Sequence, residues 1–231
     1  MTEPAAPLLR ADAVFHCRDG VEELCGVTVT FDAGKFTLLS GGCADALLRV
    51  LGLLERPDRG EVWIESQATS PLDDCARTEL RNRAFGFVFA EPFLLDSFSV
   101  AENVAMPLFK ISALDIEQAR VRTAEVLDIV RLAGAADLTV FDLSTMDRHK
   151  VSLARALANA PRVLIAEDAG AQLSAGELGE FAALLRAAAT LGVTVIATSP
   201  AGAETLGADR EIVLEAGEIV ADTRQEEPAH D

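Results

Sequence analysis

The sequence predicts an α/β domain built on a mostly parallel sheet. Short apolar runs rich in β-branched residues alternate with stretches of helical periodicity, the order expected when helices cover parallel strands. Half of the 231 residues are hydrophobic, which is ample for a buried core. No uninterrupted apolar stretch reaches about 18 residues, and residues 1–10 lack a basic start followed by an apolar run, so neither a membrane span nor a signal peptide is predicted.

Four apolar runs are predicted to be strands, and the clearest are preceded by a chain-breaking residue. A turn at residues 32–34 joins the first run to the second, and Pro161 and Gly192 precede the last two runs. The predicted strands are residues 27–31, 36–39, 163–166 and 193–197. A helix is expected from about Asp45 to Leu54, directly after the second strand.

Helix-start signals predict four further helices, three of which form an insertion between the strands. Each begins with a capping pair or an apolar periodicity. Ser99 with Glu102 starts a helix that should end before Pro107. The other signals are Ile116, Ala119, Thr123, Leu127 and Val130 at helical spacing, Ser144 with Asp147, and Ser174 with Glu177 ahead of Phe181, Leu184, Leu185 and Ala188. Residues 222–231 are acidic and polar and are expected to be a disordered tail.

Charge and cysteine content exclude several classes of function. The formal net charge of −17 argues against binding nucleic acid or adsorbing to an anionic membrane. The four cysteines, Cys17, Cys25, Cys43 and Cys75, have no metal-site spacing and are expected to be reduced thiols. His16 is interpreted as a surface histidine rather than a ligand or a base.

The segment from Leu39 to Val62 has the frame of a phosphate-binding loop without its functional side chains. Such a loop reads G-x-x-x-x-G-K-[ST], in which the Lys binds the terminal phosphates and the hydroxyl binds Mg²⁺. Counted back from Gly60, the two glycine positions hold Leu38 and Cys43, and the Lys position holds Ala44. The two hydroxyl positions hold Asp45 and Ala46. Because the cation is replaced and an anion added, triphosphate binding should be disfavoured by several kcal/mol, and Asp45 is expected to cap the helix instead.

Several spaced motifs, in one order, resemble those of the nucleotide-binding subunit of ABC transporters. The resemblance covers nearly the whole chain and is strongest to the lipoprotein-release and macrolide-exporter type. It is carried by residues 85–108 as the Q-loop region, 143–168 as the signature motif, signature helix and Walker B strand, and 208–220 as the closing strands. The resemblance implies a P-loop NTPase fold of the ABC type, with N-terminal antiparallel strands and an inserted helical subdomain. The expected limits are a core of 1–89 and 160–231 and a helical subdomain of about 90–159, within one domain of 1–231.

The resemblance also implies where the nucleotide site should lie, and the family's functional residues are missing there. Cys17 stands at the position of the adenine-stacking aromatic, Ala90 at the Q-loop Gln, and Ser199 at the switch His. Glu167 and Asp168 invert the Walker B order of Asp then Glu. In the signature motif Thr145 and Met146 replace two glycines. The vestigial nucleotide positions are Cys17, Ser40, Gly41, Gly42, Cys43, Ala44, Asp45, Ala46, Ala90 and Ser144.

Three functions are compatible with these sequence features. The leading hypothesis is a pseudo-ATPase, not itself an enzyme, that acts as a structural or regulatory partner of membrane permease subunits or of an active ATPase paralogue. In this hypothesis no cofactor and no metal are expected. The second is a weak or regulatory ATPase in which Glu167 and Asp168 hold Mg²⁺ with ATP. The third is a soluble adaptor that is no longer linked to transport.

The resemblance implies a transmembrane permease subunit, a second ABC ATPase subunit, or both, as partners. The protein is expected to be cytoplasmic and peripheral to the inner face of the cell membrane, without inserting into the bilayer itself. The predicted docking site for the permease is an apolar run in a loop, Phe93, Leu94, Leu95 and Phe98.

Overall fold

The structure is a computed structural model that describes residues 7–168, 170–199 and 206–223. The antiparallel sheet, in the order β2-β1-β4-β5, contains β1 (Leu9–Arg18), β2 (Val21–Phe31), β4 (Arg59–Ile64) and β5 (Gln67–Ala68). The second sheet, in the order β10-β9-β3-β8-β7-β6, contains β3 (Phe36–Ser40), β6 (Phe85–Val88), β7 (Val163–Ala166), β8 (Thr194–Thr198), β9 (Arg210–Glu215) and β10 (Glu218–Asp222). All its neighbouring pairs are parallel except β9 with β10. The predicted α/β class and the N-terminal antiparallel strands are confirmed.

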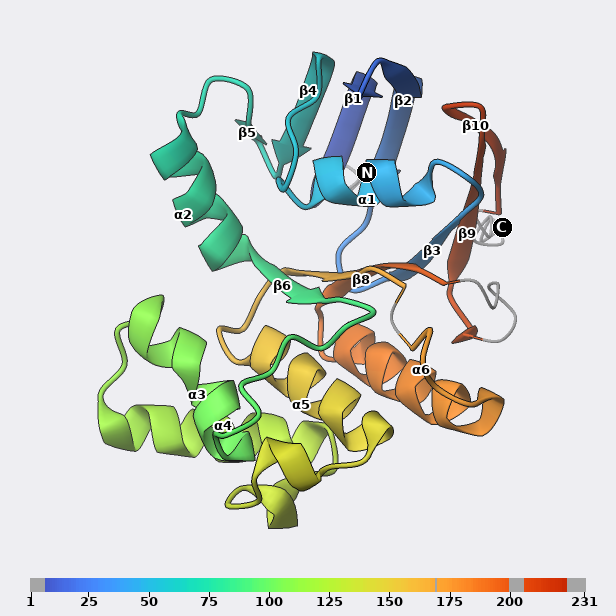
Figure 1. The fold of residues 1–231 in the computed structure, drawn as a ribbon. Helices are drawn as coiled ribbons and strands as arrows, with labels where there is room; N and C mark the ends of the chain where they lie inside the picture. The colour runs from blue at the N-terminus through green and yellow to red at the C-terminus, as the bar shows by residue number, and fades with distance from the viewer. Residues whose placement is uncertain (1–6, 169, 200–205, 224–231) are drawn as a thin grey trace, which may run out of the picture.

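Helices form two layers around the second sheet (Figure 1). One layer is formed by α1 (Ala44–Leu51), which lies between the two sheets. Helix α2 (Asp74–Ala84) comes directly before β6 in the chain. The other layer contains α3 (Val100–Lys110), α4 (Ile116–Ile129), α5 (Thr145–Leu157) and α6 (Ala175–Thr190), with short 3₁₀ turns η1 (Ala133–Ala135) and η2 (Val140–Asp142). In the described part of the chain, no helix is both long and apolar enough to cross a bilayer. The division into a core and a helical subdomain at 90–159 stays a prediction.

The core has one apolar cluster on each side of the second sheet. Between the sheets, Leu47, Leu48 and Leu51 of α1 are fully buried together with apolar residues of β1, β7 and β8. On the opposite side, α3 to α6 pack against Leu38 and Leu164. Burial of a Leu side chain contributes about 1.5–3 kcal/mol, so α1 is held chiefly by apolar contacts from both sheets.

The predicted helix starts are confirmed. Ser99 and Glu102 form the capping box of α3, and Ser174 and Glu177 form that of α6. Ser144 accepts a hydrogen bond from the backbone N–H of Asp147 at the start of α5. The buried face of α6 is the predicted one, with Phe181, Leu184, Leu185 and Ala188. These local signals are reliable because a capping side chain satisfies backbone donors within its own helix.

Three predicted helix details are wrong. The first helix ends at Leu51 rather than Leu54, because Leu53 has a left-handed φ of +57°, which a right-handed helix cannot continue through. The Leu53 carbonyl accepts hydrogen bonds from Arg77 Nε (3.3 Å) and Arg81 Nη1 (3.0 Å). α3 does not end before Pro107 but continues to Lys110, with the N–H of Ile111 bonding to the carbonyl of Pro107. Ile116 does not face the core and is 79% exposed.

The prediction of a disordered tail over residues 222–231 is also wrong at its first residue. Asp222 belongs to β10, and its carboxylate accepts two hydrogen bonds from Arg210, Nε at 2.7 Å and Nη2 at 2.6 Å. Thr223 continues this edge through its backbone N–H, which donates to the carbonyl of Glu211. The bidentate pair is a strong, directional contact that composition alone does not reveal. Residues 224–231 lie outside the described residues.

The loop between β3 and α1 depends on Gly41 because it passes directly over β9. Gly41 has a φ of +94°, and a Cβ atom on it would lie 1.9 Å from the carbonyl oxygen of Leu214. The next residue, Gly42, has open space around the corresponding position. Only the first of these two glycines is therefore required by the backbone.

We predict that Gly41→Ala lowers the free energy of unfolding by about 2 kcal/mol or more, because the methyl group must displace β9 and a left-handed φ disfavours Ala. Gly42→Ala is the matched control and should change stability by less than about 1 kcal/mol. Urea unfolding followed by circular dichroism compares the two variants. Equal losses would contradict the close approach of the loop to β9.

Candidate functional site

The candidate site lies where the strands of the second sheet end. β3, β6, β7 and β8 are parallel, so their carboxyl ends meet at one edge, where α/β proteins commonly bind ligands. β3 leads into residues 40–43, β6 into Ala90, β7 into Glu167 and Asp168, and β8 into Ser199. The fold thus gathers most of the sequence-predicted site residues at this edge.

The phosphate-loop positions form a closed turn at the start of α1. Ser40 Oγ donates to Glu211 Oε1 at 2.9 Å, and the N–H of Ala44 bonds to the carbonyl of Gly41 at 3.2 Å. Cys43 occupies the N-cap position but makes no side-chain capping hydrogen bond. Ala44 and Ala46, at the positions expected to hold the Lys and a hydroxyl, are buried. The helix start therefore has neither a cationic side chain nor a hydroxyl at these positions.

Asp45 does not have the predicted capping role. No side-chain cap bond is made at the start of α1, and Asp45 Oδ1 is buried with no hydrogen-bond partner in the described residues. The Asp45 charge instead raises the pKa values of both Glu167 and Asp168. The prediction was wrong because the parallel sheet brings the end of β7 beside α1. At that place Asp45 repels two other carboxylates.

Glu167 and Asp168 form an acidic pair whose ionisation is opposed by its surroundings. Burial is the main cause of the raised pKa of Glu167, followed by the charge of Asp45, while Arg49 acts in the opposite direction. Burial and then Asp45 likewise raise the pKa of Asp168. Arg49 Nη1 lies 3.7 Å from Glu167 Oε1. This cation comes from the last turn of α1.

Asp168 has a backbone fixed by the neighbouring strand. Its φ is +43°, and its N–H donates to Thr198 Oγ1 at 2.9 Å. A left-handed φ in a residue other than glycine is uncommon and is often found at functional sites. Glu167 and Asp168 offer carboxylates, the ligand type that a divalent cation such as Mg²⁺ prefers.

The remaining predicted positions lie in different surroundings. Cys17 is exposed on β1, and its N–H donates to Asp58 Oδ2 at 2.6 Å. Ser144 lies away from the sheet edge, at the N-terminus of α5, where its hydroxyl donates to Asp147 Oδ2 at 2.8 Å. Ala90 and Ser199 are half-buried. Ser144 is therefore a helix cap within this chain, as predicted.

His16 is not the surface histidine that the sequence suggested. Its exposed fraction is 8%, and its Nε2 lies 2.7 Å from Glu55 Oε2. This contact could not be predicted from local sequence, because the two residues lie 39 positions apart. The four cysteines are free, as predicted.

The apolar run in the loop after β6 is largely exposed, as predicted. The exposed fractions are 66% for Phe93, 43% for Leu95 and 42% for Phe98, whereas Leu94 is half-buried and packs against the core. The prediction that Leu94 lies on the docking surface is therefore corrected, because its side chain contacts the core. Arg155 holds the loop by donating to the carbonyls of Pro92 (2.7 Å) and Phe93 (2.8 Å).

An apolar cavity of about 740 Å³ adjoins this run, between α3 and α4. Phe98 lines it together with Met106, Phe109 and Ile116. Phe98 thus belongs both to the exposed run and to the lining of the cavity.

We predict that Asp45→Asn raises the free energy of unfolding by about 1 kcal/mol at neutral pH. The change relieves repulsion with two carboxylates and the cost of a buried charged oxygen, about 1–3 kcal/mol, which exceeds the helix-dipole interaction of about 0.3–1 kcal/mol that is lost. The pKa values of Glu167 and Asp168 are raised in the folded chain, so their ionised forms destabilise it. The gain should be complete above those raised pKa values and shrink as the pH falls through them.

Asp147→Asn provides the matched control, because Asp147 also lies in the first turn of a helix but is hydrogen-bonded by Ser144. Its replacement should lower stability. Urea unfolding over a range of pH measures both variants. A loss of stability in Asp45→Asn at neutral pH would restore the capping role.

Comparison with protein families identifies relatives of this chain. A family model described as "ABC transporter" matches residues 25–171. The lipoprotein-releasing system ATP-binding protein LolD of Paramagnetospirillum magneticum is 37% identical over 183 residues, covering 78% of this chain and 80% of that protein. LolD of Hyphomonas neptunium is 30% identical over 225 residues, covering 95% and 98%. The macrolide export ATP-binding/permease protein MacB of Brucella melitensis is 32% identical over 225 residues, covering 94% of this chain but 35% of MacB.

Solved structures give the same fold. The chain superposes on the "Dimeric Structure of MJ0796, a Bacterial ABC Transporter Cassette" with a TM-score of 0.80 and 26% identity, covering 93% of this chain and 97% of that one. CbiO1 from Clostridium perfringens, part of the ABC transporter complex cbiONQ, has a TM-score of 0.86 at 22% identity, covering 94% and 88%. The latter match supports the fold alone.

These relatives correct the expectation that the protein has no cofactor. LolD and MacB are named as ATP-binding proteins, and the cassette family implies ATP with Mg²⁺. The expected absence of a cofactor was wrong because it was drawn from side-chain losses alone. The residues at the start of α1 nevertheless fit a triphosphate poorly, since Asp45 has an unpartnered buried carboxylate oxygen there.

The matched segments include both sheets and the helices that the sequence motifs predicted. The family model covers more than half of the chain, and LolD of Hyphomonas neptunium aligns over almost its full length. The chain belongs to the ABC transporter family, as an ATP-binding subunit of the LolD and MacB type.

Proposed function

We propose that this chain is a pseudo-ATPase of its family, a cassette with little or no ATP hydrolysis that serves permease subunits or an active cassette as a structural or regulatory partner. The observation that carries the proposal is the charge at the start of α1. A buried, unpartnered carboxylate oxygen of Asp45 stands there, and Ala44 supplies no cation. The proposal concerns hydrolysis and leaves nucleotide binding as the family implies it.

The acidic pair at the end of β7 supports the same proposal. Glu167 is paired with Arg49, and its ionisation is opposed by burial and by Asp45. Phosphoryl transfer relies on positioned groups that stabilise developing negative charge. An added carboxylate has the opposite effect, and a displacement of about 1 Å in a reacting group can cost about 100-fold in rate.

The relatives supply the kind of partner. MacB joins an ATP-binding part and a permease in one chain, CbiO1 is part of a transporter complex, and MJ0796 forms a dimer. By analogy, this chain works with a transmembrane permease and pairs with a second cassette, and it is peripheral to the cytoplasmic face of the membrane through the permease. Phe93, Leu95 and Phe98 form the proposed docking surface, with Leu94 packing beneath them.

ATP turnover of the purified chain should be at least about 100-fold below that of LolD from Paramagnetospirillum magneticum assayed in parallel. A fluorescent ATP analogue measures binding separately, so weak binding and slow chemistry are distinguished. Turnover comparable to that of LolD would contradict the pseudo-ATPase proposal.

Two variants identify the source of any residual turnover. Glu167→Gln should abolish activity that arises from this site, whereas Glu215→Gln, at the exposed end of β9, should not change it. If turnover is substantial and depends on Glu167, the alternative of an altered ATPase that uses Glu167 and Asp168 is favoured.

The docking surface is tested with Phe93→Ser and Phe98→Ser together. Both side chains are substantially exposed, so the fold should remain intact by circular dichroism while co-purification with a co-expressed permease is lost. Leu191→Ser is the matched control, because Leu191 is 65% exposed at the end of α6. Retained binding in the double variant, or loss of binding in the control, would contradict the assignment.

A further inference from the structure

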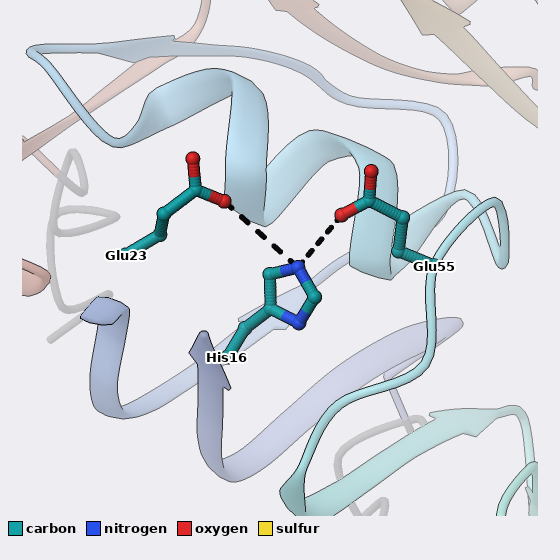
Figure 2. A group of neighbouring side chains, drawn as sticks. All are labelled: His16, Glu23 and Glu55. Carbon is teal, nitrogen blue, oxygen red and sulfur yellow. Dashed lines mark hydrogen bonds and ion pairs between the residues drawn. The ribbon is translucent and has the colours of Figure 1, made fainter. Parts of the chain in front are cut away.

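We propose that His16, Glu23 and Glu55 form a zinc site that joins the antiparallel sheet to the segment after α1. Figure 2 shows the two glutamate side chains facing the same imidazole nitrogen. His16 Nε2 lies 2.7 Å from Glu55 Oε2 and 3.8 Å from Glu23 Oε2. The ligand atoms of these residues all lie within 4.8 Å of one another, a property that no other group in the described part of the chain shares.

The spacing of these atoms fits a tetrahedral ion. Ligand bonds of about 2.0–2.2 Å place neighbouring ligand atoms about 3.3 Å apart. The two observed distances, 2.7 and 3.8 Å, lie on either side of this value. Relative to that value, Glu55 Oε2 would move away from Nε2 by about 0.6 Å and Glu23 Oε2 toward it by about 0.5 Å. The side chains supply three ligands, and water completes the fourth position.

A β-bulge in the first hairpin places Glu23 beside His16. His16 pairs with Leu24, and Cys17 pairs with Glu22, so Glu23 is an extra residue between the two pairs. In regular pairing Glu23 would point to the face opposite Leu24. A bulge redirects a side chain in this way, and bulges are enriched next to functional sites.

The second nitrogen of His16, Nδ1, lies near a carboxylate but makes no hydrogen bond to it. The exposed fraction of His16 is only 8%, and its Nδ1 has no hydrogen-bond partner in the described residues. The nearest carboxylate oxygen among its ion-pair partners is Asp58 Oδ2, 3.9 Å from Nδ1. A histidine that binds a metal through one nitrogen usually donates a hydrogen bond from the other to such a carboxylate. An ion bound through Nε2 requires that nitrogen without a proton, so metal binding at this histidine is coupled to proton release.

The surrounding charge favours a cation. Among the described residues, the guanidinium groups of Arg18 and Arg49 contact three carboxylates, those of Glu23, Glu55 and Glu167. Asp58 adds a fourth carboxylate beside His16. Arg49 and Arg18 contact Oε1 of Glu55, whereas Oε2 faces His16. Glu55 can therefore bind an ion through Oε2 and keep both arginine contacts. Imidazole with carboxylates suits zinc among the divalent ions.

The test is calorimetric titration of the chelator-treated full chain with Zn²⁺, together with thermal unfolding. We expect one ion per chain with a dissociation constant in the micromolar range or tighter, and a melting temperature that rises with Zn²⁺ and falls again with EDTA. No saturable binding, or no shift in melting temperature, would overturn the proposal.

Variants assign the ion to these side chains. His16→Gln and Glu23→Gln should each weaken zinc binding by at least about tenfold, and Asp58→Asn by about 10- to 100-fold. Glu22→Gln, which removes the same charge at the exposed neighbouring position, should bind like the unaltered chain. If His16→Gln fails to fold, Glu23→Gln carries the test, because the Glu23 side chain is only half-buried. Unchanged affinity in Glu23→Gln would overturn the proposal.

Co²⁺ distinguishes this site from the free cysteines. Bound at His16, Glu23 and Glu55, it should show the visible d–d absorption of tetrahedral Co²⁺ without a thiolate charge-transfer band. A thiolate band would assign the ion to cysteine and overturn the proposal.

Discussion

The guanidinium group of Arg49 lies among three carboxylates that come from distant parts of the chain. It contacts Glu55 Oε1 at 3.1 Å, Glu23 Oε2 at 3.5 Å and Glu167 Oε1 at 3.7 Å. Arg49 lies on α1, whose leucines are fully buried between the two sheets. Removing one partner from a half-buried charge network leaves the others uncompensated. Apolar packing holds α1 in place, and Arg49 on it holds Glu23, Glu55 and Glu167 around one shared charge.

Arg49 also explains how the site tolerates its loss of a loop cation. Asp45 lies one helical turn before Arg49, so both side chains can face the end of β7. Asp45 raises the pKa of Glu167, and Arg49 lowers it. The two charges that act in opposite directions on the pKa of Glu167 therefore both belong to α1, and neither belongs to the loop. The frame of the phosphate-binding fold is kept by Gly41 and by apolar packing, neither of which requires the chemistry of hydrolysis.

The sequence predicted the features that depend on neighbouring residues. Capping pairs such as Ser99 with Glu102 act within one helical turn, and the loop frame before Gly60 depends on fixed spacing. Sequence reasoning failed where distant segments meet. It assigned Asp45 to the helix dipole because it could not place Glu167 and Asp168 beside it. It placed His16 on the surface because Glu55 is 39 positions away and the bulge at Glu23 leaves no signal in the residue pattern.

The zinc proposal and the acidic site at β7 are connected through the same arginine. Glu23 and Glu55, two of the proposed zinc ligands, are also two of the three partners of Arg49. An ion bound to these glutamates would neutralise part of the charge that now attracts Arg49 toward them. Arg49 would then be attracted less strongly to Glu23 and Glu55, and its attraction to Glu167 would become relatively stronger. This follows because the electrostatic field at the guanidinium group is the sum of the fields of the neighbouring charges. The antiparallel sheet would in this way influence the carboxylates at the phosphate site, through the rigid helix α1 that lies between them.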